Sequence, residues 1–129
     1  MTVFVSKDCH YSMVKSANQL GIGTNNIVKV DVDISGRMDP KALERSIQVS
    51  VRNGSKPFFV GATAGTTVRG CFDPIKEISK VCKKYNIWLH IDALQASQEN
   101  FRCYHRVQMF HHHFYIQQVH SSFLTARFL

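Results

Sequence analysis

The sequence predicts an α/β fold, in which helices cover both faces of a mostly parallel β-sheet in three layers. Short apolar runs alternate with amphipathic segments from residue 1 to residue 93. Two amphipathic segments open on an Asp-Pro pair, and the last apolar run ends in a lone carboxylate, Asp92. Strands that are joined by helical crossovers run parallel, with right-handed connections.

Residues 2–5 (Thr-Val-Phe-Val) are typical of a short buried strand. A helix is expected to follow over Tyr11–Leu20, with Val14 and Ala17 on its inner face. Gly21 is its expected stop, because glycine readily adopts the left-handed conformation that ends helices.

Ile27–Asp31 is the second predicted strand, and a turn is expected over residues 33–37. The next helix should start at Asp39-Pro40, with Asp39 as the N-cap and Pro40 at the first helical position. Gly54 should end it. Apolar residues recur every fourth position on its inner face: Leu43, Ile47 and Val51.

Asp73-Pro74 repeats this pattern and predicts another capped helix. Its expected apolar face consists of Ile75, Ile78, Cys82 and Tyr85. Apolar runs at residues 57–63 and 87–92 flank this helix, so the three segments form a β-α-β unit.

Residues 94–129 depart from this pattern. They contain no Gly, Pro, Lys or Asp, and they hold five of the seven histidines and five of the nine phenylalanines. Their apolar residues show no sustained helical or strand period. We therefore expect a divergent, poorly ordered tail that arose by aberrant splicing or a frame change. The alternative is a genuine C-terminal extension.

Composition indicates one soluble domain, with no apolar run long enough to span a membrane and no convincing signal peptide. The net charge of +7 is spread along helix faces, so we expect no nucleic-acid partner. Four scattered cysteines indicate reduced thiols and a cytoplasmic protein. The histidines at residues 111–113 favour adventitious metal capture, and no metal centre is expected.

Polar residues follow three predicted strands at their carboxyl ends, where ligands bind in open α/β sheets. His10 follows the first strand, Thr66 and Thr67 follow the strand at residues 57–63, and Asp92 closes the last one. Taken alone, His10 is more often a capping residue and the threonines are more often turn residues. A buried carboxylate is costly without a partner. Together these groups suit a flat heteroaromatic cofactor whose ring nitrogen is protonated, such as pyridoxal 5'-phosphate.

Residues 1–93 resemble part of the large domain of the group II pyridoxal-phosphate-dependent decarboxylases. The resemblance is strongest to the glutamate, cysteine-sulfinate and acidic amino acid decarboxylases. It rests on five motifs in the order of that family: Ser6-Lys7-Asp8-Cys9-His10-Tyr11-Ser12, Leu20-Gly21-Ile22-Gly23-Thr24, Ala62-Thr63-Ala64-Gly65-Thr66-Thr67, Phe72-Asp73-Pro74 and Trp88-Leu89-His90-Ile91-Asp92-Ala93.

The resemblance implies a fragment of the fold type I transferase large domain and a role for each matching residue. His10 matches a catalytic histidine that stacks on the pyridine ring and can touch the substrate. Thr67 matches a cofactor-contacting threonine, Asp92 the partner of the pyridinium nitrogen, and Ala93 an alanine that packs the ring. The implied reaction is decarboxylation of an acidic amino acid by a homodimer.

The match ends at Ala93, and no lysine follows Lys84 to bind the cofactor covalently. The family's phosphate-holding loop has no counterpart here, so we expect this chain to be inactive. One alternative is a non-catalytic fragment that binds or interferes with full-length decarboxylase subunits. Another is a different fold type I activity, such as an aminotransferase, against which the motifs at residues 62–67 and 72–74 count.

Overall fold

A computed structural model of the chain describes residues 1–64, 72–92, 114–119 and 123–128. Its sheet has six strands in the order β2-β1-β3-β4-β6-β5. The strands are β1 (Thr2–Ser6), β2 (Ile27–Val30), β3 (Pro57–Thr63), β4 (Trp88–Asp92), β5 (Phe114–Val119) and β6 (Phe123–Phe128). The first four pair in parallel, as predicted, whereas β6 is antiparallel to both β4 and β5.

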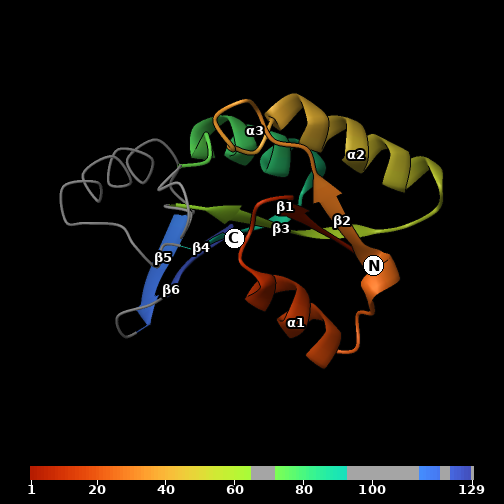
Figure 1. Ribbon diagram of the computed structural model, residues 1–129, viewed down its shortest axis with the longest axis horizontal. Helices are drawn as coiled ribbons and strands as arrows, with labels where there is room; N and C mark the ends of the chain where they lie inside the picture. The colour runs from red at the N-terminus through yellow and green to blue at the C-terminus, as the bar shows by residue number, and fades with distance from the viewer. Residues whose placement is uncertain (65–71, 93–113, 120–122, 129) are drawn as a thin grey trace.

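Helices lie on both faces of the sheet, which confirms the three-layer α/β prediction (Figure 1). Helix α1 (Tyr11–Gln19) covers one face, and α2 (Pro40–Arg52) and α3 (Ile75–Tyr85) cover the other. A short 3₁₀ turn, η1 (Thr24–Asn26), leads into β2. Each predicted helix and strand of residues 1–92 is present, with bounds that differ by at most two residues.

The main core lies between the sheet and the α2–α3 layer. Buried side chains from the strands meet buried side chains from both helices there, including Phe4, Val60, Leu89, Leu43, Ile47 and Ile78. Because side chains alternate along a strand, the neighbouring residues Val5, Gly61 and His90 face the α1 side. The residues of each strand that do not point into this core therefore point to the opposite face of the sheet.

Helix α1 lies very close to β3. A Cβ atom added to Gly61 would collide with the Cε methyl of Met13 and would touch a methyl of Val5. The absence of a side chain at Gly61 thus allows α1 to pack against the centre of the sheet.

The α2 start confirms one capping prediction. Asp39 is the N-cap, and its carboxylate accepts a hydrogen bond from the Lys41 N–H over 2.9 Å. The inner-face assignment of Val51 is wrong, because that residue is 52% exposed. A four-residue step advances about 40° beyond a full helical turn. Ser50 is buried in its place, and its hydroxyl donates to Thr2 Oγ1 over 3.0 Å.

The α3 start contradicts the other capping prediction. Pro74 occupies the N-cap position without a side-chain hydrogen bond to the helix, and the Asp73 carboxylate bonds elsewhere. Glu77 lies in the first turn of α3 and Lys83 and Lys84 in its last, where their charges complement the helix dipole.

Strands β5 and β6 lie in the segment for which the sequence shows no strand period. Hydrogen bonds to the edge of β4, at His90 and Ile91, extend the parallel sheet with this antiparallel pair. Backbone pairing at a sheet edge does not require an alternating side-chain pattern, so a search for periodicity does not detect it.

Candidate functional site

The candidate site lies at the edge of the sheet that is formed by the carboxyl ends of three parallel strands. Val5, Gly61 and His90 lie side by side on β1, β3 and β4. Two residues further along, Thr63 of β3 lies beside Asp92 of β4. The carboxyl ends of these strands are therefore level, and the loop that carries His10 leaves from the same edge.

Asp92 is the most unusual group at this edge. The residue is 8% exposed, and its Oδ1 atom has no hydrogen-bond partner in the described part of the chain. Its backbone carbonyl, by contrast, accepts a hydrogen bond from the Ala64 N–H over 2.7 Å. A buried carboxylate oxygen without a donor is unfavourable, so this atom is suited to a ligand that carries an N–H group.

Asp73 is a second buried carboxylate at this edge, and it is fully engaged. Its Oδ1 accepts from the Met38 N–H and its Oδ2 from the Thr63 N–H, both over 2.7 Å. Burial is the main influence on the pKa of this carboxyl group and raises it, while the two backbone hydrogen bonds oppose that shift. Sequence reasoning missed this role because an Asp-Pro pair usually marks a helix start.

His90 lies two positions before Asp92 and therefore on the same face of β4. Its ring stacks on Phe59 of β3 at a centroid distance of 5.8 Å. Burial lowers the pKa of His90, and the Asp92 charge opposes that shift. The sequence signal that could have identified His90 as a site residue is its polarity at a strand position whose side chain shares a face with Asp92.

His10 has the capping role that the residue type favours on its own. It is the N-cap of α1, and its Nδ1 accepts from the Ser12 N–H over 3.3 Å and lies 2.8 Å from Ser12 Oγ. When the ring is neutral, this arrangement leaves the proton on Nε2. The ring is exposed and lies 4.5 Å from that of Tyr11, so its other edge remains accessible.

The pKa of the Cys9 thiol depends on the charged groups at this edge. Burial is the largest influence on the pKa of its thiol and raises it; the Lys29 charge lowers it, and the Asp73 and Asp92 charges raise it further. Both carboxylates therefore affect the pKa of this thiol. Its raised pKa disfavours the reactive thiolate form.

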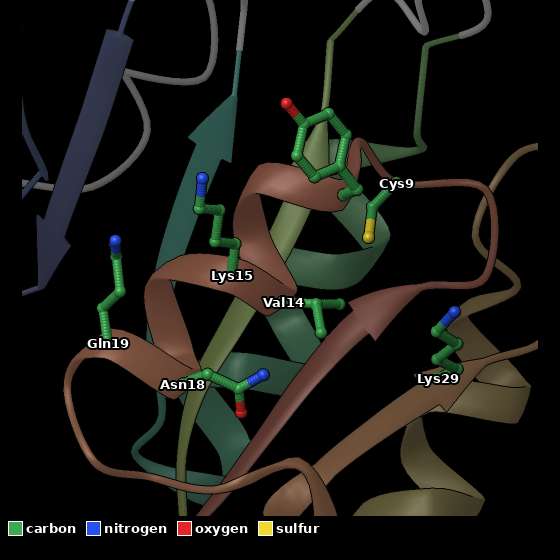
Figure 2. Close-up of a pocket in the computed structure, with 7 residues that line it drawn as sticks. Cys9, Val14, Lys15, Asn18, Gln19 and Lys29 are labelled. Carbon is green, nitrogen blue, oxygen red and sulfur yellow. The ribbon is translucent and has the colours of Figure 1, made fainter.

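A surface hollow of about 640 Å³ opens beside Cys9, between α1 and β2 (Figure 2). Figure 2 shows Lys15 and Gln19 on α1, and Lys29 on β2. Both lysines are exposed, and no buried polar group lines this hollow. We assign no ligand to it.

Two of the predicted site residues, Thr67 and Ala93, lie outside the described residues, as do Thr66 and the histidines at 111–113. Among the residues that the structure does describe, no three His, Cys, Asp or Glu side chains are grouped to hold a metal ion. None of the helices described is long and apolar enough to cross a membrane.

Comparison with protein families gives a match over most of the chain. Residues 1–111 match the sequence model of the family described as the pyridoxal-dependent decarboxylase conserved domain. The acidic amino acid decarboxylase of Bos taurus is 50% identical over 93 residues, which are 72% of this chain and 18% of that protein. The cysteine sulfinic acid decarboxylase of Rattus norvegicus is 48% identical over 93 residues, 72% of this chain and 19% of the relative.

Solved structures agree with this match. The crystal structure of mouse CSAD is 48% identical, with a TM-score of 0.69 over 70% of this chain and 19% of that one. The 4-hydroxyphenylacetaldehyde synthase of Rhodiola rosea is 33% identical, with a TM-score of 0.68 over 70% of this chain and 20% of its own. The chain thus spans about a fifth of the length of the relatives that it matches.

Proposed function

Because this chain belongs to the pyridoxal-dependent decarboxylase family, as its motifs predicted, we propose that it carries part of a site for pyridoxal 5'-phosphate. In this proposal residues 1–93 are the partial cofactor domain, and residues 94–129 are a divergent tail. The observation that carries the proposal is the buried Asp92 Oδ1, which has no hydrogen-bond partner in the described part of the chain.

Asp92 fits the protonated ring nitrogen of this cofactor. The nitrogen would provide the N–H donor that Oδ1 lacks, and the opposite charges would stabilise each other in a site shielded from water. When bound, pyridoxal phosphate supplies an electron sink for a carbanion next to the amino group of the substrate. The task of Asp92 is to keep the ring nitrogen protonated.

Three further residues are proposed as contacts of the cofactor. His10 lies on the loop after β1 at the same edge of the sheet, and its exposed ring could stack on a flat ligand. Thr67 and Ala93 are proposed as cofactor contacts because of their positions in the motifs.

An acidic amino acid is the proposed substrate of the longer enzymes that share this domain, because two of the similar relatives are named for such substrates. We propose that the 129-residue chain alone does not decarboxylate them. No lysine follows Lys84, and the α3 lysines Lys76 and Lys80 are on the face of the sheet opposite the Asp92 side chain. The downstream lysine that the family resemblance implies as the covalent partner of the cofactor therefore has no counterpart after Asp92 in this sequence.

An absorbance titration with pyridoxal 5'-phosphate tests the cofactor proposal. The chain should give a saturable spectral change, and Asp92→Asn should weaken binding by about tenfold or more, which is the loss of one charge-assisted hydrogen bond. Asp31→Asn is the matched control. It makes the same change at the same sheet edge, but its carboxylate is 75% exposed and pairs with Lys7.

Equal binding by the chain and Asp92→Asn would refute the role of Asp92. Release of CO₂ from glutamate, aspartate or cysteine sulfinate by the purified chain would refute the proposed inactivity.

A further inference from the structure

The chain contains two Asp-Pro pairs that lead into helices, and the structure uses them differently. Asp39 caps its own helix and is partly exposed. Asp73 is 5% exposed, and both of its oxygens accept hydrogen bonds from residues outside α3. Burying a carboxylate is costly, and Asp73 does not cap α3, so its two hydrogen bonds must serve another purpose.

The Asp73 carboxylate joins three segments of the chain. Oδ1 accepts from the N–H of Met38, which precedes α2, and Oδ2 accepts from the N–H of Thr63 at the end of β3. The Asp73 N–H also donates to the Thr63 carbonyl over 2.9 Å. Thr63 is therefore held on both its N–H and its carbonyl by one residue.

Thr63 connects this clamp to Asp92. The two residues are paired neighbours on β3 and β4, and the next amide, that of Ala64, donates to the Asp92 carbonyl over 2.7 Å. Thr63 with Asp92 is the last β3–β4 register pair among the described residues. The clamp thus acts on the strand residue that pairs with Asp92.

We propose that Asp73 is a positioning residue, which fixes the end of β3 and thereby the backbone of Asp92. A carboxylate suits this task because both of its oxygens accept, whereas an amide would direct its NH₂ group at one of the two N–H donors. The inference rests on the proposed function for its relevance to the cofactor, but its structural part stands on hydrogen bonds in the chain itself.

Amide hydrogen exchange tests the structural part without any ligand. In Asp73→Asn the Ala64 amide should exchange about tenfold faster than in the unmodified chain, relative to the amides of buried Phe4 and Val60, which report global opening. Asp39→Asn, the matched change at the other Asp-Pro pair, should leave that ratio unchanged. An unchanged Ala64 ratio in Asp73→Asn would overturn the proposal.

A double-mutant cycle on pyridoxal phosphate binding tests the link to Asp92. Asp73→Asn should weaken binding roughly three- to tenfold in the unmodified chain and hardly at all in Asp92→Asn, because a positioning residue acts only through the group it positions. Equal losses in both backgrounds would show a general structural effect and overturn the link.

The two measurements separate the two proposals. If the unmodified chain does not bind pyridoxal phosphate, the proposed function fails, while the exchange experiment still decides whether Asp73 holds the strand end. If Asp73→Asn does not fold, Asp73→Glu takes its place in both measurements. Glutamate keeps both acceptors but displaces them by one methylene group, so the same accelerated exchange at Ala64 is expected, and its absence counts against the clamp.

Discussion

The Ala64 N–H donates to the backbone carbonyl of Asp92 over 2.7 Å, while the carboxylate Oδ1 of Asp92 is buried without a partner in the described part of the chain. The backbone carbonyl of this residue is therefore paired, whereas one oxygen of its side chain has no partner among the described residues. Burial of a carboxylate oxygen without a donor costs stability. Proteins accept such costs at binding sites, where a ligand can offset them.

Replacing Asp92 should therefore change the stability of the chain and its binding of the cofactor in opposite directions. Asp92→Asn removes a buried charge and should stabilise the ligand-free chain by about 1 kcal/mol, while weakening cofactor binding. Urea denaturation of the two proteins without ligand gives the free energy difference. A less stable Asp92→Asn would mean that the carboxylate is already satisfied in the folded chain.

The two Asp-Pro pairs should differ in what their loss costs. Asp39→Ala removes one exposed cap and should cost about 1 kcal/mol of unfolding free energy. Asp73→Ala leaves the buried N–H groups of Met38 and Thr63 without acceptors and should cost about 3 kcal/mol. Urea midpoints with a common slope provide the comparison. Equal costs would mean that the buried hydrogen bonds accepted by the Asp73 carboxylate contribute no more than an ordinary helix cap.

His90 should make the stability of the chain depend on pH. Because burial lowers the pKa of His90 below its ordinary value of about 6.5, the unfolded chain takes up the proton first as the pH falls. The stabilising contribution is thus present above about pH 6.5 and is lost as the pH falls through the lowered folded pKa. His90→Gln should have a smaller difference in urea midpoint between pH 5.5 and pH 7.5.

An equal or larger pH difference in His90→Gln would contradict this account. A second measurement tests the influence of the Asp92 charge on the pKa of His90. Because the Asp92 charge raises the pKa of His90, Asp92→Asn should lower that pKa further in an NMR titration of the imidazole ring.

A methyl group at Gly61 should destabilise the chain modestly. Gly61→Ala places its Cβ against the Met13 methyl and should cost about 1 kcal/mol, since the long Met13 side chain can partly move away. In a Met13→Ala background the same change should cost less, because the colliding atom is gone. Denaturation of the four proteins of this cycle gives the coupling. Additive costs would mean that the β3 backbone, rather than Met13, limits this position.

Much of the fold follows from local signals along the chain. Apolar runs of strand length, the glycine after α1 and the Asp39-Pro40 pair mark where elements begin and end, and they do so through nearest-neighbour sterics and hydrogen bonding. The same signals place Asp92 at a strand end. Its polarity in an apolar run marks it as a candidate site residue without knowledge of its contacts.

The sequence alone does not assign partners to polar side chains, because hydrogen bonds between distant segments have no local pattern. Asp39 and Asp73 precede the same residue type, yet only the packing of α3 against the sheet turns Asp73 toward Met38, which is 35 positions away. The pairing of Thr63 with Asp92 and the stack of His90 on Phe59 arise in the same way. The sequence by itself determined the elements and the position of Asp92 at a strand end; the tertiary structure decided that both oxygens of Asp73 are paired, whereas one oxygen of Asp92 has no partner in the described part of the chain.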